Sequence, residues 1–147
     1  MLADLVNSRQ NIIERARPLL QRDEVVAHVV RASEGPGKVV AGLGAMAAAV
    51  VVGVLSRVPF LVFPLSAIFY TSLYPRRILL ATDQALVLLA GTRWRWTPRR
   101  VLDRLDVDTP IGPLKGFFMH ADVNGRRLWI VPRCVPEVKA ADEDLQT

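Results

Sequence analysis

The feature that most constrains this chain is a pair of uncharged apolar runs near its middle, separated by a short turn. The first run, Val39–Leu55, has 17 residues, and the second, Val58–Pro75, has 18. As helices each would be about 26 Å long, against a bilayer hydrocarbon core of roughly 30 Å. Arg57 lies between the runs, where a charge suits an aqueous turn better than the bilayer centre. The pattern predicts a transmembrane helical hairpin, with a re-entrant hairpin as the alternative geometry.

Basic residues flank the two apolar runs more heavily than they occupy the turn. Arg31 and Lys38 precede the first run, Arg76 and Arg77 follow the second, and the turn holds only Arg57. By the positive-inside rule, both termini are expected to be cytoplasmic. The sequence therefore predicts a multi-pass protein of the inner (plasma) membrane.

Composition divides the chain into four segments. Residues 1–38 hold apolar side chains at helical spacing, which predicts an amphipathic helix and a lead-in to the hairpin of residues 39–75. Residues 76–136 are expected to form a cytoplasmic β domain, followed by an acidic tail over residues 137–147. The apolar stripe of the first helix could pack on this β domain, on the membrane surface or in a groove of a partner.

The pattern after the hairpin is that of β-strands. Residues 77–81 and 85–90 are compact apolar runs on either side of a polar turn, which predicts a β-hairpin. The sequence RWRWT at residues 93–97 alternates strictly, which favours a strand with both tryptophans on one face.

A second hairpin is predicted around Asn124 and Gly125, because both central positions of a type I′ turn need a positive φ. Its strands are expected at residues 117–123 and 127–131. These five strands, or six with the segment around residue 102, would make a small antiparallel sheet. Residues 24–31 suit either a short strand or a helical lead-in. The predicted fold class is thus membrane α+β, with a transmembrane hairpin and a small antiparallel β domain.

The order of these elements resembles that of small bacterial membrane proteins that carry a pleckstrin-homology-like (PH-like) domain after two transmembrane helices. The resemblance rests on Tyr74, Arg76, Thr82, Asp83 and Gly91 around the first hairpin, on the GPLKG sequence at residues 112–116 and on the closing hairpin to Trp129. A full PH-like fold has seven strands and a closing C-terminal helix. Here no apolar helix is evident after residue 132, so we expect an incomplete barrel, completed by residues 24–31 or by another protein.

The layout is also similar to that of the LucB-type accessory subunit of mammalian-cell-entry (Mce) lipid importers. This resemblance implies a non-catalytic inner-membrane subunit that docks on permease subunits of a larger complex.

The chain has a net charge of +5 and contains many arginines. Arginines and tryptophans that follow the second apolar run are expected to contact anionic lipid headgroups, since each basic residue near such a surface contributes about 1 kcal/mol. They are Arg76, Arg77, Arg93, Trp94, Arg95, Trp96, Arg99 and Arg100. Nucleic acid is a less favoured partner, because no recognised binding motif accompanies the charge.

A stripe of small residues occurs at four-residue spacing in the first apolar run: Ala41, Ala45, Ala49 and Gly53. Small residues let helix backbones approach closely, which is how helices associate in lipid. The stripe could dock on a partner helix, or it could simply receive the aromatic side chains of the second run.

No catalytic residue, metal ligand set or cofactor motif is predicted. His28 and His120 are far apart in the sequence without acidic residues at metal-ligand spacing, and Cys134 has no identifiable base partner. The leading hypothesis is a non-catalytic accessory subunit that stabilises or regulates a larger membrane complex, possible partners being integral-membrane proteins such as importer permeases. The alternative is a membrane-anchored PH-like module that binds anionic lipid headgroups.

Overall fold

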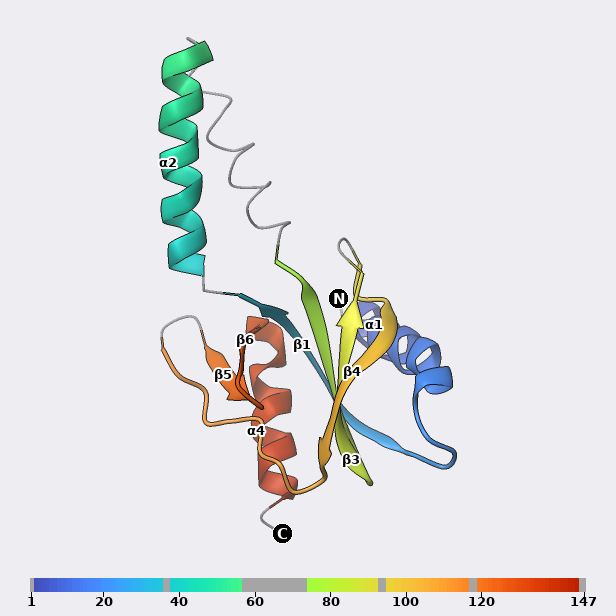
Figure 1. Ribbon diagram of the computed structural model, residues 1–147. Helices are drawn as coiled ribbons and strands as arrows, with labels where there is room; N and C mark the ends of the chain where they lie inside the picture. The colour runs from blue at the N-terminus through green and yellow to red at the C-terminus, as the bar shows by residue number, and fades with distance from the viewer. Residues whose placement is uncertain (1, 36–37, 57–73, 93–94, 117–118, 146–147) are drawn as a thin grey trace. The chain divides into compact units, whose positions relative to one another are not determined.

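The computed structural model describes residues 2–35, 38–56, 74–92, 95–116 and 119–145. The chain divides into two compact units, Met1–Glu34 with Pro75–Thr147 and Gly35–Tyr74. The second unit contains helix α2 (Lys38–Ser56). The first unit contains α1 (Leu2–Ala16), η1 (Arg17–Leu19), β1 (Val26–Glu34), β2 (Arg76–Thr82), β3 (Ala85–Gly91), β4 (Pro98–Asp106), β5 (His120–Val123), β6 (Arg126–Ile130), η2 (Pro132–Cys134) and α4 (Val135–Asp144). Figure 1 labels most of these elements.

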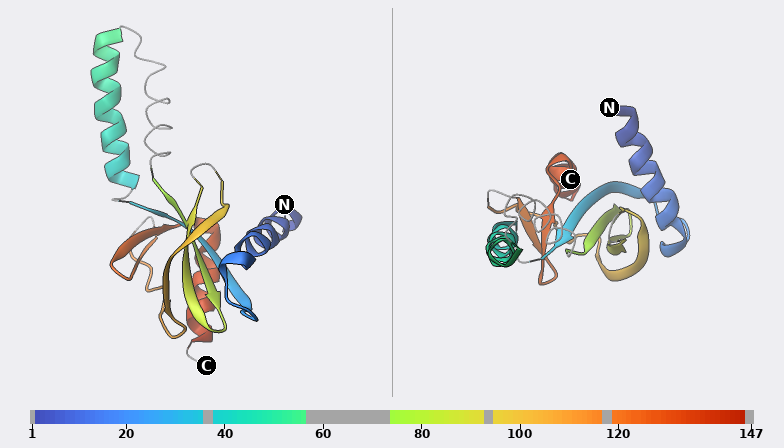
Figure 2. Two further views of the ribbon diagram at one scale, coloured as in Figure 1. Left: turned by 45° about the vertical axis from the view of Figure 1, so that its right-hand side comes forward. Right: turned by 90° about the horizontal axis from the view of Figure 1, so that it is seen from above.

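The first unit is built on a six-stranded antiparallel sheet in the order β4-β3-β2-β1-β6-β5. Strand β1 lies inside this sheet, paired with β2 along most of its length and with β6 at its end. Residues 24–31 thus contribute to a strand, and this strand joins the two halves of the sheet. Figure 2 shows that the sheet is strongly curled.

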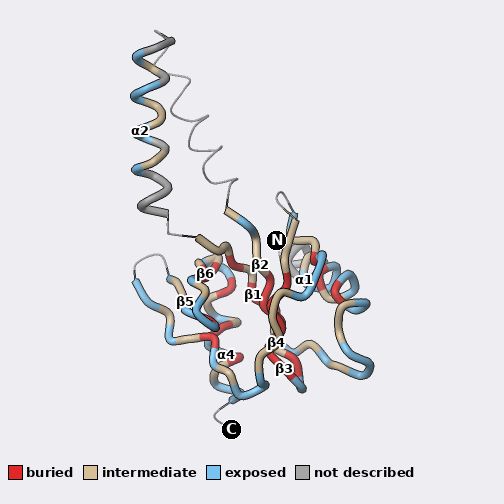
Figure 3. The backbone as a smooth tube through the Cα atoms, in the orientation of Figure 1, coloured by how far each residue is buried: buried red, intermediate tan, exposed pale blue. Residues whose placement is uncertain are grey.

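The apolar runs of β2 and β3 are buried on both faces. Along β2, Leu79 belongs to one core cluster while its neighbours Ile78 and Leu80 belong to the other. Consecutive strand residues point to opposite faces, so a strand covered on both sides needs apolar residues at every position. This explains why the sequence shows continuous apolar runs here, and Figure 3 shows buried residues concentrated along these strands.

Helix α4 covers the inner face of the curled sheet. Val138 and Ala141 of α4 are buried in the same cluster as Leu88 of β3 and Leu128 of β6. A proline near its start suits the first turn of a helix, where the missing N–H would be unpaired anyway. Residues 137–144 of the expected acidic tail therefore lie in a packed helix. Sequence analysis missed this packing because only two apolar side chains of the helix are buried, with Val135 partly buried beside them.

Helix α1 covers the outer face. Its residues Ile12 and Ala16 are buried against Val29, Ile78 and other residues of β1–β3. The predicted amphipathic helix is therefore confirmed. Three surfaces were considered for the apolar stripe of this helix. Its described residues pack on the sheet of the same chain.

Both predicted β-hairpins are present. Strands β2 and β3 pair from Arg77 with Ala90 to Ala81 with Leu86, and β5 pairs with β6. Asn124 and Gly125 have φ values of 49° and 74°, the positive values that the turn needs.

The described part of the RWRWT segment, residues 95–97, does not form the predicted strand. Arg93 and Trp94 lie outside the described residues, and the rest of the segment belongs to the loop between β3 and β4. The Thr92 N–H donates to the Thr97 carbonyl oxygen at 3.1 Å, and the Arg95 N–H donates to the Thr92 hydroxyl at 3.1 Å. These bonds hold Arg95 and Thr97 next to Thr92, and the next strand is the charged segment Pro98–Asp106.

The predicted transmembrane hairpin, and with it the membrane fold class and the multi-pass inner-membrane location, is corrected by the structure. Within the described residues, no helix is sufficiently long and apolar for a membrane crossing. Helix α2 includes the first run between its polar ends, Lys38 and Ser56. The second run, Val58–Pro75, lies almost wholly outside the described residues.

Packing of α4 should be essential for stability. We expect Val138→Ala to lower the free energy of unfolding by about 2 kcal/mol, because it deletes two buried methyl groups and leaves a cavity. Lys139→Ala, at the next and exposed position of the same helix, is the control and should leave the stability unchanged. The measurement is the urea midpoint of both variants, and equal midpoints would show that α4 does not belong to the cooperative core.

Candidate functional site

Strand alternation places Arg76 and Arg77, two of the predicted headgroup contacts, on opposite faces of the sheet. Arg76 follows the same alternation as Ile78 and lies on the outer face, which α1 covers. On β1, Arg31 shares this outer face with Val29. Ser33 pairs with Arg76, so Arg31 and Arg76 are diagonal cross-strand neighbours.

Both outer arginines lie against one tryptophan. The guanidinium carbon of Arg76 is 4.9 Å from the ring centroid of Trp96, and that of Arg31 is 6.0 Å from it. At such distances a guanidinium is attracted by the aromatic face, by about 0.5–2 kcal/mol depending on exposure. These three residues form a surface group that we call the Arg–Trp cluster.

Helix α1 and the β3–β4 loop hold the Arg–Trp cluster in place. Trp96 packs against the outer core cluster, and the Arg15 guanidinium donates to the Thr97 hydroxyl at 3.1 Å. Arg31 donates a long hydrogen bond of 3.5 Å to the Ser8 hydroxyl of α1. Among the described residues, neither Arg31 nor Arg76 forms an ion pair with a carboxylate.

Arg77, by contrast, is occupied by an ion pair on the inner face. Its Nε atom lies 2.6 Å from Glu34 Oε2, and Arg126 Nη1 lies 3.0 Å from Glu34 Oε1. This carboxylate thus bridges β2 and β6 across β1. Arg77 has a structural partner and is not placed for binding a headgroup with Arg76.

The other predicted headgroup contacts are distributed around the β3–β4 loop. Arg95, Arg99 and Arg100 are exposed. They lie close to Trp96 in the sequence but do not belong to the Arg–Trp cluster. Arg93 and Trp94 lie outside the described residues.

The predicted small-residue stripe lies on α2, which belongs to the second unit. Ala49 and Gly53 are half-buried, while the side chains of Ala41 and Ala45 fall outside those described. Among the side chains of this helix that are described, the larger apolar ones are exposed: Leu43, Met46, Val50, Val51 and Val54.

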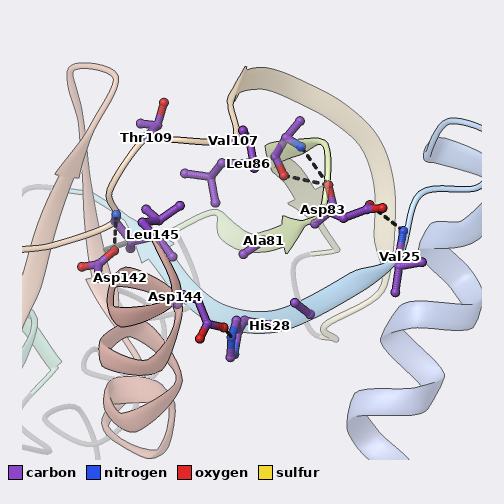
Figure 4. A pocket seen from close by; sticks show the side chains of 15 residues that line it. Val25, His28, Ala81, Asp83, Leu86, Val107, Thr109, Asp142, Asp144 and Leu145 are labelled. Carbon is purple, nitrogen blue, oxygen red and sulfur yellow. Dashed lines mark hydrogen bonds and ion pairs between the residues drawn. The ribbon is translucent and has the colours of Figure 1, made fainter. Parts of the chain in front are cut away.

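The structure also contains a pocket that was not predicted from the sequence. It has a volume of about 250 Å³ and lies between the start of β1, the β2–β3 turn, the segment after β4 and the end of α4, all within the first unit (Figure 4). Leu86 and Ile111 are among the buried apolar residues of its wall, and His28, Asp83 and Asp144 are among its polar residues.

A β-bulge at Ala27 shapes one side of this pocket. Val26 pairs with Thr82 and His28 with Ala81, so Ala27 has no partner across the ladder. The extra residue interrupts the alternation, which places Val26 in the outer core cluster and leaves Ala27 and His28 lining the pocket. Bulges commonly re-aim side chains next to binding sites in this way.

His28 connects β1 to α4 through two carboxylates. Its Nδ1 atom lies 3.1 Å from Glu137 Oε2, and its Nε2 atom lies 2.8 Å from Asp144 Oδ2. Burial lowers the pKa of His28, but the hydrogen bonds and charges of Asp144 and Glu137 outweigh this effect and raise the pKa above its ordinary value. The imidazolium is therefore stabilised in the folded protein.

A second charged network joins the lead-in of β1 to β2 and β4. The Thr82 hydroxyl donates to Glu24 Oε1 at 2.5 Å, and Arg104 Nη2 donates to the same oxygen at 2.8 Å. Burial raises the pKa of Glu24, yet these bonds and one from the Gln21 N–H outweigh it, so the pKa is lowered. The Glu24 carboxylate thus has all of these partners within the protein, and we assign the network a structural role.

His28, Glu137 and Asp144 form a group that we call the His28 cluster. Sequence reasoning missed it because both carboxylates lie more than 100 positions after His28. The described residues contain no group of three His, Cys, Asp or Glu side chains arranged to hold a metal ion. Cys134 is buried in the inner core cluster, as expected of a structural thiol.

Comparison of the chain with protein-family models, with curated proteins and with solved structures finds no match. The resemblances to PH-like proteins and to Mce accessory subunits consequently remain predictions.

The His28 cluster predicts a pH-dependent stability. Because the folded pKa is raised, the stabilising contribution is complete below the unfolded pKa of about 6.5 and is lost as the pH rises through the folded value. The free energy of unfolding should fall over this range in the native chain, and this fall should disappear in His28→Gln. The control His120→Gln leaves the cluster intact and should retain the fall, and if His28→Gln retained it too, the cluster would not contribute.

Proposed function

We propose that this chain is a non-catalytic binding module that recognises an anionic lipid headgroup through the Arg–Trp cluster. The observation that carries the proposal is that Arg31 and Arg76 lie over the same Trp96 ring without a carboxylate partner among the described residues. Two neighbouring positive charges repel each other, and an anion between them would relieve that repulsion.

The geometry suits a phosphate group. The two guanidinium carbons are at most about 11 Å apart, since both lie near one ring. Both side chains are half-buried, so salt screens their charges less than it screens fully exposed ones. Guanidinium groups bind phosphate oxygens with paired hydrogen bonds, and the half-buried indole restricts their motion. The exposed Arg95, Arg99 and Arg100, which lie within four positions of Trp96 in the sequence, add to the positive charge of the chain.

Flotation of the full chain with lipid vesicles tests this proposal. The ratio of binding to vesicles containing anionic phosphatidylglycerol over binding to neutral phosphatidylcholine vesicles measures the headgroup contribution, independently of apolar contacts. Arg76→Gln should lower this ratio about fivefold, since one arginine near an anionic surface contributes about 1 kcal/mol.

Arg127→Gln is the matched control, because Arg127 is an exposed arginine on β6 that pairs with Asp122 outside the cluster. It removes the same net charge and should lower the ratio much less. If both variants lost binding equally, general charge and not the Arg–Trp cluster would be responsible.

A second candidate function is docking on a partner protein through α2. It is favoured by the exposed apolar residues of this helix, of which Leu43, Met46, Val50 and Val54 follow helical spacing. Monomeric proteins rarely expose large contiguous apolar surfaces unless these bind something. In this role the chain would be an accessory subunit of a larger assembly.

Masses of native complexes isolated from the source cells test the second function. Val50→Lys combined with Val54→Lys should abolish a stoichiometric complex, because two charges would be buried at the interface. Val101→Lys, an exposed valine on β4, should preserve the complex. A wild-type chain that is only ever recovered as a monomer would exclude this function.

A further inference from the structure

We propose that the pocket beside the β1 bulge binds a small organic cation with an aliphatic body, such as an alkylammonium compound. This site is separate from the Arg–Trp cluster and does not depend on the function proposed for it. The pocket is lined by residues of β1, the β2–β3 turn, the segment after β4 and α4, so it is formed only in the folded sheet (Figure 4).

Exposed aliphatic side chains converge on this pocket. In the described part of the sheet unit, five large apolar residues are exposed, namely Val25, Val101, Val107, Met119 and Leu145. Three of them, Val25, Val107 and Leu145, line this single pocket. Exposed apolar residues are normally scattered, so their convergence around a hollow with a buried apolar wall indicates a ligand site.

Charge selects the kind of ligand. Asp83 Oδ1 accepts the Val25 N–H at 2.9 Å, and Asp144 Oδ2 lies 2.8 Å from His28 Nε2. The second oxygen of each carboxylate has no hydrogen-bond partner among the described residues. Asp142 also lines the pocket, but both of its oxygens accept backbone N–H groups. Two carboxylate oxygens are thus available to a ligand.

The lysines and arginines of the described protein lie outside this pocket. No lysine or arginine is among the described residues that line the pocket, although the chain carries 19 such residues against 14 acidic ones. His28 is the one basic side chain of the lining, and both of its nitrogens face carboxylates, those of Glu137 and Asp144. The pocket is therefore acidic within a basic protein.

Size favours a small molecule over a protein segment. A volume of about 250 Å³ lies just below the roughly 300–1,000 Å³ of typical ligand pockets. A stable protein interface would need about 800 Å² on each partner, whereas only three exposed aliphatic side chains surround this hollow.

Calorimetric titration of the full chain with three probes of equal length tests the proposal: n-octylammonium, 1-octanol and octanoate. We expect octylammonium to bind most tightly and octanoate at least about fivefold more weakly. This order opposes the net charge of the protein, which by itself would favour octanoate. If octanoate bound as tightly as octylammonium, or if octylammonium did not bind by about 10 mM, the proposal would be wrong.

Two pairs of variants locate the site. Val107→Ala should weaken octylammonium binding about three- to tenfold by removing apolar contact, whereas Val101→Ala, equally exposed but outside the pocket, should not. Asp83→Asn should reduce the preference for octylammonium over octanol, whereas Asp122→Asn on β5 should not. All four positions are exposed, so the variants should fold. Equal effects within either pair would place binding elsewhere on the chain.

Discussion

Strand β1 hydrogen-bonds along both of its edges, and the rest of the sheet unit depends on this double pairing. Ala32 and Ser33 pair with Arg77 and Arg76 of β2 on one side and with β6 on the other. The β2–β3–β4 half and the β5–β6 half are thereby held in one curled sheet, whose inner face α4 closes. Glu34 reinforces the junction, because its carboxylate binds an arginine from each half. Without β1, the two halves would share no strand and the inner core cluster would have no continuous wall.

The parts of this fold that could be predicted are those determined by neighbouring residues. The two β-hairpins depend on turn chemistry, such as the positive φ of Asn124 and Gly125, and the amphipathic helix depends on its own periodicity. Features determined by distant residues could not be predicted. Residues 24–31 were compatible with a strand, but nothing local showed that this strand would be central. The alternation of RWRWT is equally typical of a strand, yet its described residues, 95–97, lie outside the strands and bond to Thr92.

The candidate sites also combine features that depend on neighbouring residues with features that depend on distant ones. Arg76 and Trp96 were recognisable as a basic and aromatic group, but their third member, Arg31, lies 45 positions before Arg76 and joins them only through strand pairing. Strand alternation also places Arg77 on the face opposite Arg76, which could not be predicted from residue type alone. The pocket has no sequence signature, because its walls come from four separate segments and its shape depends on one extra residue at Ala27. Charge is segregated as well: a basic cluster lies on the outer face, and an acidic hollow lies beside the bulge.

The segment between β1 and β2 is inserted at one end of their ladder. The Glu34 N–H donates to the Pro75 carbonyl oxygen at 3.0 Å, so about 40 residues leave and re-enter the sheet at adjacent points. In the sheet they occupy the place of an ordinary hairpin turn, and closing so long a loop costs only about 2–3 kcal/mol more than closing a loop of two residues. The ladder of β1 and β2 is thus insensitive to what it encloses. Insertions or deletions in the enclosed segment should therefore change the stability of the sheet little, and the two candidate sites on the sheet should keep their geometry.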